Sequence, residues 1–131
     1  MSTRGVYTFK EKGVLFHVYS HWDSYPTGGA QKLQLTLTSG KAWTLPRYEA
    51  DEFAAAFIAT NKNTSGNIRL QKGRTSATDV EFGYTIWPDL KTRQLMLEVS
   101  ATDFWGPKPT ERSLWKGLLT EFTEEIAERL E

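Results

Sequence analysis

The segment 21–29, HWDSYPTGG, places an imidazole, a carboxylate, a serine hydroxyl and a phenol within nine consecutive positions. His21 is a potential general acid or base, and Ser24 and Tyr25 are potential nucleophiles beside it. A glycine-flanked nucleophile elbow, which would present such a serine for attack, does not occur in this segment. The sequence therefore disfavours a serine hydrolase and favours a non-enzymatic protein, without excluding an enzyme.

The spacing of the histidines also disfavours a metal site. His17 and His21 share one face of a predicted strand but lie four residues apart, which separates them by about 13 Å. His21 and Asp23 alone are fewer than the three or four protein ligands of a zinc site. The chain has no cysteine, and no glycine-rich phosphate loop ending in Lys-Ser or Lys-Thr occurs. We therefore predict no metal and no cofactor.

A β-hairpin is predicted immediately before this segment. The runs 5–10 and 14–20 are rich in β-branched and aromatic residues and flank Glu11-Lys12-Gly13, a tight-turn sequence. Antiparallel pairing around that turn sets Arg4 opposite Ser20 or His21. Arg4 is therefore expected to meet Asp23, in an ion pair or through a shared ligand anion. The cation, imidazole, carboxylate and phenol of Arg4, His21, Asp23 and Tyr25 would then share one corner.

The same residues also fit a purely structural turn. Asp23 or Ser24 could cap a following helix, with Pro26 tolerated in its first turn. Gly28 and Gly29 either let a ligand approach the amides of that helix or mark a strained turn. Both interpretations stay open at the level of sequence.

The remaining pattern predicts an α+β fold in a single domain, residues 1–131. The C-terminal stretch from Thr110 to Leu130 repeats apolar residues at helical spacing and predicts a long helix. We expect an antiparallel sheet built from two hairpins, with a candidate fifth strand, and two or three helices packed on it. The other expected elements are helices at 30–37 and 46–60, the candidate strand at 68–70, and a second hairpin formed by 80–86 and 94–101 around a turn at 88–93.

A second candidate binding surface is the loop 103–109, DFWGPKP, in which Phe104 and Trp105 are adjacent large aromatics. Aromatic residues on a rigid loop can anchor a partner protein. They could equally fold back over the sheet edge or the last helix, because exposed aromatic patches are costly to solubility. The other tryptophans are expected in the core or at its rim: Trp22, Trp43, Trp87 and Trp115.

Charge and hydropathy narrow the class of partner. Sixteen basic and sixteen acidic residues give no net charge, so the field that steers nucleic-acid binders is missing. A local basic stretch at 62–74, with Lys62, Arg69, Lys72 and Arg74, leaves salt-dependent nucleic-acid binding as an alternative. No apolar run is long enough to span a bilayer, and no signal-peptide pattern is present. We expect a cytoplasmic protein without a membrane partner; the oligomeric state stays undetermined.

The beginning of the chain resembles a known pattern. Thr3-Arg4, the hairpin, and then His21 to Pro26 with Gly28 resemble a family of small, functionally uncharacterised proteins of bacteriophages, prophages and bacteria, whose pattern reads T-R followed by H-W-D-G-Y-P-x-G. Ser24 stands where that pattern has glycine, and beyond the motif only the element order agrees. The resemblance implies an accessory protein that binds a host protein, including host-defence components.

We therefore predict an interaction protein that binds its host partner through one of two surfaces. The first is the corner around Arg4, with His21, Trp22, Asp23 and Tyr25, and the second is the loop around Trp105. The alternative is a nucleotide- or phosphodiester-directed protein, with Arg4 holding the phosphate of a small phosphorylated ligand and His21 acting as acid or base. Nucleic-acid binding through the basic stretch is the second alternative.

Overall fold

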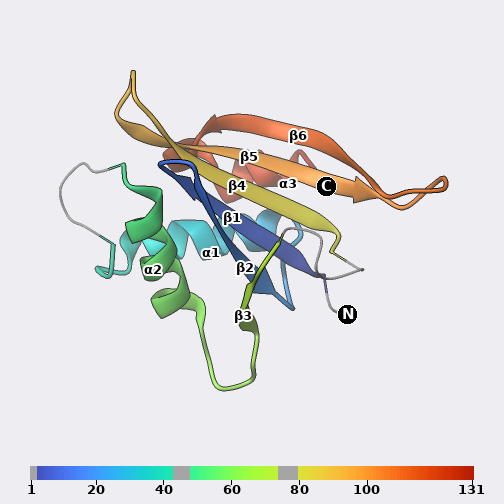
Figure 1. The fold of residues 1–131 in the computed structure, drawn as a ribbon, viewed down its shortest axis with the longest axis horizontal. Coiled ribbons are helices and arrows are strands. Elements are labelled where there is room, and N and C mark those ends of the chain that lie inside the picture. Colours follow the sequence, from blue (N-terminus) through green and yellow to red (C-terminus); the bar gives the residue numbers. More distant parts are fainter. Residues whose placement is uncertain (1–2, 43–47, 74–79) are drawn as a thin grey trace.

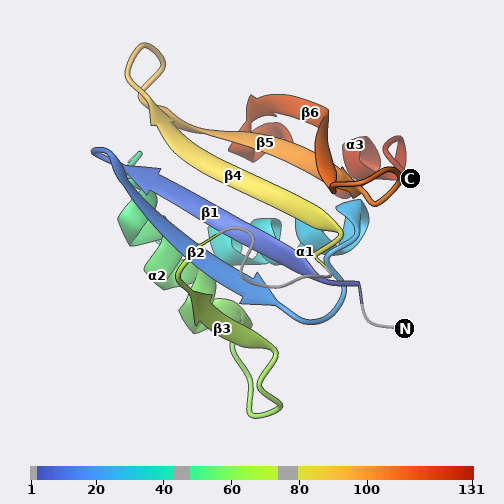
Figure 2. The same cartoon turned by 45° about the vertical axis from the view of Figure 1, so that its right-hand side comes forward.

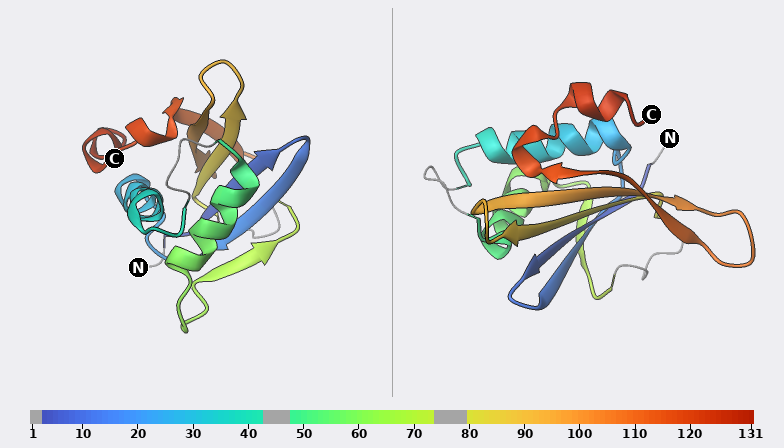
Figure 3. Two further views of the ribbon diagram at one scale, coloured as in Figure 1. Left: turned by 90° about the vertical axis from the view of Figure 1, so that its left-hand side faces the viewer. Right: turned by 90° about the horizontal axis from the view of Figure 1, so that it is seen from above.

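The computed structural model describes residues 3–42, 48–73 and 80–131. One six-stranded sheet, ordered β3-β2-β1-β4-β5-β6, carries the helices on one face (Figures 1 and 3). The elements along the chain are β1 (Gly5–Glu11), β2 (Val14–Ser20), α1 (Pro26–Thr38), α2 (Ala50–Asn61), β3 (Ile68–Gln71), β4 (Phe82–Asp89), β5 (Gln94–Asp103), β6 (Thr110–Leu118), the 3-10 turn η1 (Leu119–Glu121) and α3 (Glu124–Glu128).

The predicted first hairpin is confirmed, including its register. Gly5 faces Ser20, so Arg4 and His21 are the next residues at the open end of the hairpin. Lys12 and Gly13 have φ values of 50° and 81°. Two successive positive φ angles suit a tight turn between right-twisted strands, and glycine adopts such an angle without steric strain.

The predicted all-antiparallel sheet is wrong. Strand β1 pairs antiparallel with β2 but parallel with β4, and Tyr7 faces Tyr84 in that parallel pair. Parallel neighbours need a long crossover, which the chain between Ser20 and Phe82 supplies with both helices and β3. The alternation of apolar residues in a strand is the same for either direction, so the pattern alone does not reveal the parallel pair.

The predicted long C-terminal helix is also wrong. Residues Thr110–Leu118 form β6 on β5, so the sheet has six strands, and only the short α3 follows η1. A register shift between Val99 and Ser100 lets both Leu114 and Trp115 pack toward the core, which produces the apparent helical spacing. Pairing with the exposed edge of β5 therefore overrides the local periodicity.

The other predicted elements are present with shifted ends. Helix α1 starts earlier, at Pro26, and α2 covers Ala50–Asn61, while positions 46 and 47 lie outside the described residues. The candidate strand at 68–70 is β3. Strands β4 and β5 are longer than predicted, and Pro88 pairs with Leu95 inside the hairpin instead of forming its turn.

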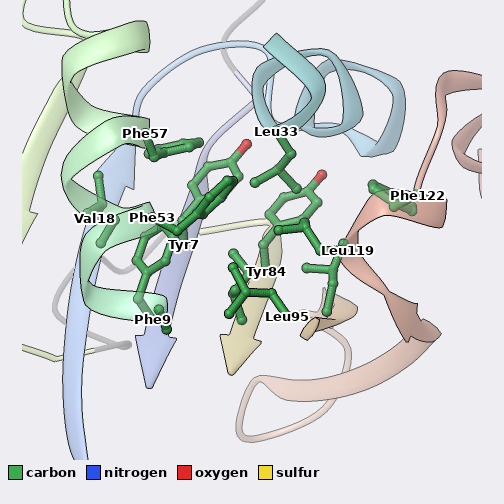
Figure 4. Packing of buried hydrophobic residues seen from close by; sticks show 14 of the residues in the cluster. Tyr7, Phe9, Val18, Leu33, Phe53, Phe57, Tyr84, Leu95, Leu119 and Phe122 are labelled. Carbon is green, nitrogen blue, oxygen red and sulfur yellow. The ribbon is translucent and has the colours of Figure 1, made fainter. Parts of the chain in front are cut away.

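The core lies between the sheet and the helices (Figure 4). Tyr7, Phe9 and Tyr84 point from the strands toward Phe53 and Phe57 of α2 and Leu33 of α1, and all six are fully buried. Phe122, just after η1, closes the core beside Tyr84, with its ring centroid 5.0 Å from that of Trp115. Trp115 packs against this core, as predicted, whereas Trp22 and Trp87 are half-buried outside the core cluster, and Trp43 lies outside the described residues.

Replacing Phe122 with alanine tests the observed C-terminal packing. Phe122→Ala should lower the free energy of unfolding by about 3 to 5 kcal/mol, because it empties a fully buried aromatic site. The neighbouring Glu121→Ala, at an exposed position, should change it by less than about 0.5 kcal/mol. Urea unfolding of both variants measures the difference, and equal small effects would contradict this packing.

Candidate functional site

Ser24, in the middle of the HWDSYPTGG segment, is fully buried and ties the segment to the sheet. Its amide donates to the carbonyl of Thr3 over 3.0 Å. Its hydroxyl is hydrogen-bonded to the Tyr7 hydroxyl at 3.2 Å, and the Tyr84 hydroxyl donates to its carbonyl oxygen at 2.7 Å. The serine of the motif is therefore a structural anchor with no exposed hydroxyl for nucleophilic attack.

The two tyrosines that hold Ser24 stack on each other. Their ring centroids are 4.6 Å apart and the rings are 7° from parallel. Burial raises the pKa of the Tyr7 hydroxyl, an effect only partly offset by the hydrogen bond to Ser24. Burial also raises the pKa of Tyr84, and the neighbouring Tyr7 adds to this shift. Both phenols therefore stay neutral at ordinary pH and serve as hydrogen-bonding groups of the core.

The glycines around the segment allow close packing. A Cβ atom on Gly5 would lie 2.5 Å from the Ser24 Cβ, and one on Gly28 would lie 2.0 Å from the carbonyl oxygen of Asp23. A Cβ atom on Gly29 would lie 2.4 Å from the Tyr84 ring and its hydroxyl oxygen. Real side chains do not approach so closely, so these glycines support the structural interpretation of the motif.

The expected side-chain cap of the helix is not present. Tyr25 is the N-cap of α1 and makes no side-chain capping hydrogen bond. Asp23 has a φ of 54°, in the left-handed region that Asp tolerates better than most residues. Its carbonyl oxygen accepts a hydrogen bond from Lys32 Nζ at 2.7 Å, and burial lowers the pKa of that lysine.

Arg4 and Asp23, both within the described part of the chain, do not form the predicted ion pair. Arg4 lines a hollow of about 560 Å³ with Glu81, Phe82 and Asp103 at the end of strands β4 and β5. Its carbonyl oxygen accepts from the amides of Glu81 and Phe82 at 3.0 and 3.3 Å. Among the described residues, no ion pair joins Arg4 to Asp23, so the ion-pair form of that prediction is wrong, and the other form, a shared ligand anion, stays a prediction.

His21 is held by its neighbours. Its Nδ1 is hydrogen-bonded to the Tyr19 hydroxyl at 2.8 Å, and its amide donates to the Asn67 carbonyl at 2.9 Å. The Trp22 ring meets the imidazole edge-on, with centroids 5.0 Å apart. The hydrogen bond to Asn67 connects the segment to the residue before β3, so His21 links the end of β2 to the start of β3.

Tyr25 is the most exposed aromatic residue of the segment, with 36% of its surface accessible. The exposed carboxylate of Asp23 lies beside it in sequence. The corner thus presents Asp23 and Tyr25 to solvent, while Ser24 and the glycines are covered.

The loop between β5 and β6 is different, because its aromatic residues are exposed. Trp105 is 90% accessible and Phe104 is 49% accessible, so the interpretation in which they fold back onto the sheet is wrong. Figures 1 and 3 show this hairpin extending beyond the body of the molecule, and in Figure 2 its loop lies at the end opposite the β4–β5 turn. Gly106 has a φ of 95°, and Pro107 and Pro109 restrict the returning strand.

The basic stretch is also exposed where the structure describes it. Lys62, Arg69 and Lys72 are all accessible, with Arg69 on the edge strand β3. Arg74 lies outside the described residues. Within the described ranges, no three His, Asp or Glu side chains are placed to hold one metal ion. None of the helices in those ranges has the length and apolar character required to cross a bilayer.

Sequence reasoning missed one further surface, a hollow on the face of the sheet opposite α1, α2 and α3 (Figure 3). The hollow has a volume of about 630 Å³ and includes His17, Glu98 and Glu111. The signal was present in the alternation of the strands, since His17 and Glu98 each lie between two apolar residues. The pattern shows which face each residue occupies, but only the strand order brings them together.

The contact between Tyr7 and Ser24 predicts coupled stabilities. Ser24→Ala should lower the free energy of unfolding by about 1 to 3 kcal/mol, because the buried Tyr7 hydroxyl loses its partner. In the background of Tyr7→Phe, which lacks that hydroxyl, the serine substitution should cost less. Denaturant unfolding of the four proteins measures this coupling, and strictly additive effects would contradict a structural role for the contact.

The buried tyrosines predict a loss of stability in alkali. Their folded pKa values lie above the ordinary 10.0, so the folded state keeps protons that the unfolded state releases. Stability should be unaffected by these groups below pH 10 and should fall above it, by about 1.4 kcal/mol per pH unit for each tyrosine. Unfolding experiments between pH 9 and 11, with Tyr7→Phe as the comparison, measure the slope. An unchanged slope in Tyr7→Phe would contradict the assignment.

Comparison with protein-family models, with curated proteins and with solved structures finds no match to this chain. The resemblance of the HWDSYP motif to the phage and prophage proteins therefore stays a prediction. The positions of the side chains supply the remaining evidence about function: a turn built around Ser24, an exposed hairpin loop around Trp105, and a polar hollow on the sheet face opposite the helices.

Proposed function

We propose that this chain is a small accessory protein of phage type that acts by binding a host protein, and that Trp105 is the anchor of the contact. The observation that carries the proposal is the 90% exposure of the Trp105 side chain at the end of a projecting hairpin. The phage setting rests on the motif resemblance alone.

Trp105 has the properties of an interface hot spot. Tryptophan is among the residues that dominate binding energies, because its large ring fills a pocket and loses little side-chain entropy. The adjacent Phe104 is 49% exposed and enlarges the apolar surface. Two antiparallel strands and two prolines hold the loop, so binding has less chain entropy to overcome.

The charges near the loop indicate the chemistry of the partner. Lys108 is exposed within the loop, and Arg112 follows at the start of β6 with 58% of its side chain accessible. The nearby Asp103 pairs with Arg112 at 3.3 Å, which leaves Lys108 as the cation beside the aromatic pair. We therefore propose that the partner presents an apolar pocket with an acidic rim.

Quantitative affinity capture from bacterial lysate tests the proposal. A host protein should be retained by the wild-type chain, and Trp105→Ala should reduce its recovery at least tenfold, because the anchoring ring is lost. Leu90→Ala is the matched control, since Leu90 is 79% exposed at the tip of the β4–β5 hairpin, at the opposite end of the sheet (Figure 1). This variant should bind as the wild type does.

Two outcomes would contradict the proposal. The first is equal recovery of every protein by the wild type, Trp105→Ala and Leu90→Ala. The second is a change of oligomeric state in Trp105→Ala, measured by sedimentation, without loss of a host protein. In that case the exposed tryptophan contacts a second copy of the chain.

A further inference from the structure

The sheet divides between β1 and β4 at one of its ends. These two strands are parallel, and their pairing extends as far as Phe9 and Ile86. Beyond that point each strand continues in its own hairpin, β1 with β2 to Glu11 and β4 with β5 to Asp89. The two hairpins therefore leave the parallel pair in opposite directions, as the strand order β2-β1-β4-β5 requires (Figure 2).

Pro88 explains why the pairing ends there. The amide of Phe82 donates to the carbonyl of Arg4 at 3.3 Å, so it points toward β1. Amides two residues apart in a strand point to the same edge, which places Tyr84, Ile86 and then Pro88 on that side. Proline has no amide hydrogen, so β4 donates no further hydrogen bond to β1 at that position. The two strands can thus separate without leaving an unpaired donor.

A hollow of about 580 Å³ lies between the ends of the two hairpins. Open sheets bind ligands in such crevices, at the carboxyl ends of parallel strands whose connections leave in opposite directions. The volume is also within the range of small-molecule sites, about 300 to 1,000 Å³. The hollow beside Arg4, by contrast, lies at the amino ends of the same two strands. The strand topology therefore favours the crevice between the hairpins as a ligand site.

Part of the wall of this crevice is aromatic. Trp87 contributes from β4, and Tyr48 contributes from the chain just before α2. Both side chains are half-buried outside the hydrophobic core cluster. Tryptophan and tyrosine rings bind planar aromatic groups by stacking or edge-to-face contact. The wall is therefore suited to a ligand with a flat aromatic ring.

Ammonium groups surround the same aromatic wall. Lys10 and Lys12 line the crevice from the first hairpin, and both are exposed. The ammonium of Lys116 lies 5.6 Å from the centroid of the Trp87 ring. Three positive charges around one crevice favour a ligand that carries a negative group.

The two carboxylates of the crevice lie at the N-terminus of α2. Glu11 Oε1 accepts a hydrogen bond from the amide of Ala50, the first residue of that helix, at 2.6 Å. Glu49 is the residue that immediately precedes the helix. The positive end of the helix dipole offsets negative charge at this place. The lysines therefore set the charge preference of the crevice, and the contact of Glu11 with α2 holds one of its walls in place.

We propose that the crevice between the two hairpins binds a small planar aromatic ligand that carries a negative group. The ring of the ligand lies against Trp87, and Lys10 and Lys12 hold the negative group. An aromatic carboxylate and a nucleoside phosphate share this chemistry. The crevice lies at the opposite end of the sheet from the Trp105 loop, so this proposal and the proposed host contact stand or fall independently (Figure 1).

Amide-resolved NMR titration with two pairs of compounds tests the proposal. Each pair contrasts an anion with its neutral counterpart: indole-3-acetate with indole-3-acetamide, and adenosine 5′-monophosphate with adenosine. At least one anion should shift the signals of Lys12, Gly13 and the Trp87 indole in a saturable way, and should bind about tenfold more tightly than its neutral counterpart. The pair that responds identifies the negative group as a carboxylate or a phosphate.

Two variants separate the role of the charges from that of the ring. Lys10→Gln/Lys12→Gln should remove the preference for the anion, because it removes both charges and keeps polar side chains. Trp87→Leu should weaken the anion and its neutral counterpart alike, since both use the ring surface. The matched control is Lys62→Gln/Arg129→Gln, which removes the same charge from exposed positions at the C-terminal ends of α2 and α3. It should titrate as the wild type does.

The proposal is overturned if neither anion binds more tightly than its neutral counterpart, or if the preference survives Lys10→Gln/Lys12→Gln. It is equally overturned if Trp87→Leu binds as tightly as the wild type, or if no signal of the crevice moves up to about 5 mM of either anion. Should Trp87→Leu fail to fold, the double lysine variant decides the outcome by itself, because both of its positions are exposed.

Discussion

The stacked pair of Tyr7 and Tyr84 is the interaction on which the rest of the structure depends. It lies on the only parallel strand pair of the described sheet, at the point where two hairpins meet. Both hydroxyl groups turn to Ser24, which fixes the path of the chain as it leaves the sheet. Helix α1 can then lie directly on Tyr84, because Gly29 has no side chain.

This arrangement separates the structural residues from the exposed ones. The HWDSYPTGG segment has the types of residue expected of an active site. Its serine, however, is buried against β1 and β4, and its two glycines allow close packing. The most exposed aromatic surface of the described residues lies elsewhere, at the β5–β6 loop around Trp105. A polar side chain in a motif therefore indicates function only after its neighbours in space are known.

Some features of the candidate sites could be predicted from the sequence and others could not. The hairpin register was predictable, because a glycine turn and two alternating runs leave few pairings. The ion pair between Arg4 and Asp23 was not, since the register sets the Cα positions of the two segments and leaves the direction of their side chains open. The exposure of Trp105 was undecided, because packing against the edge or projecting beyond it depends on the length of β5 and β6. The hollow around Glu98 required the strand order.

By itself the sequence determined the α+β composition, the first hairpin, both central helices and the place of the HWDSYPTGG turn at the end of that hairpin. These features follow from local rules, since turn glycines and short-range periodicity act within a few residues. Only the tertiary structure decided the parallel pairing of β1 with β4, the strand β6 in place of a long helix, and the burial of Ser24. Each of these depends on contacts between segments far apart in the chain, where the energy of burying a face or pairing an edge exceeds local preference.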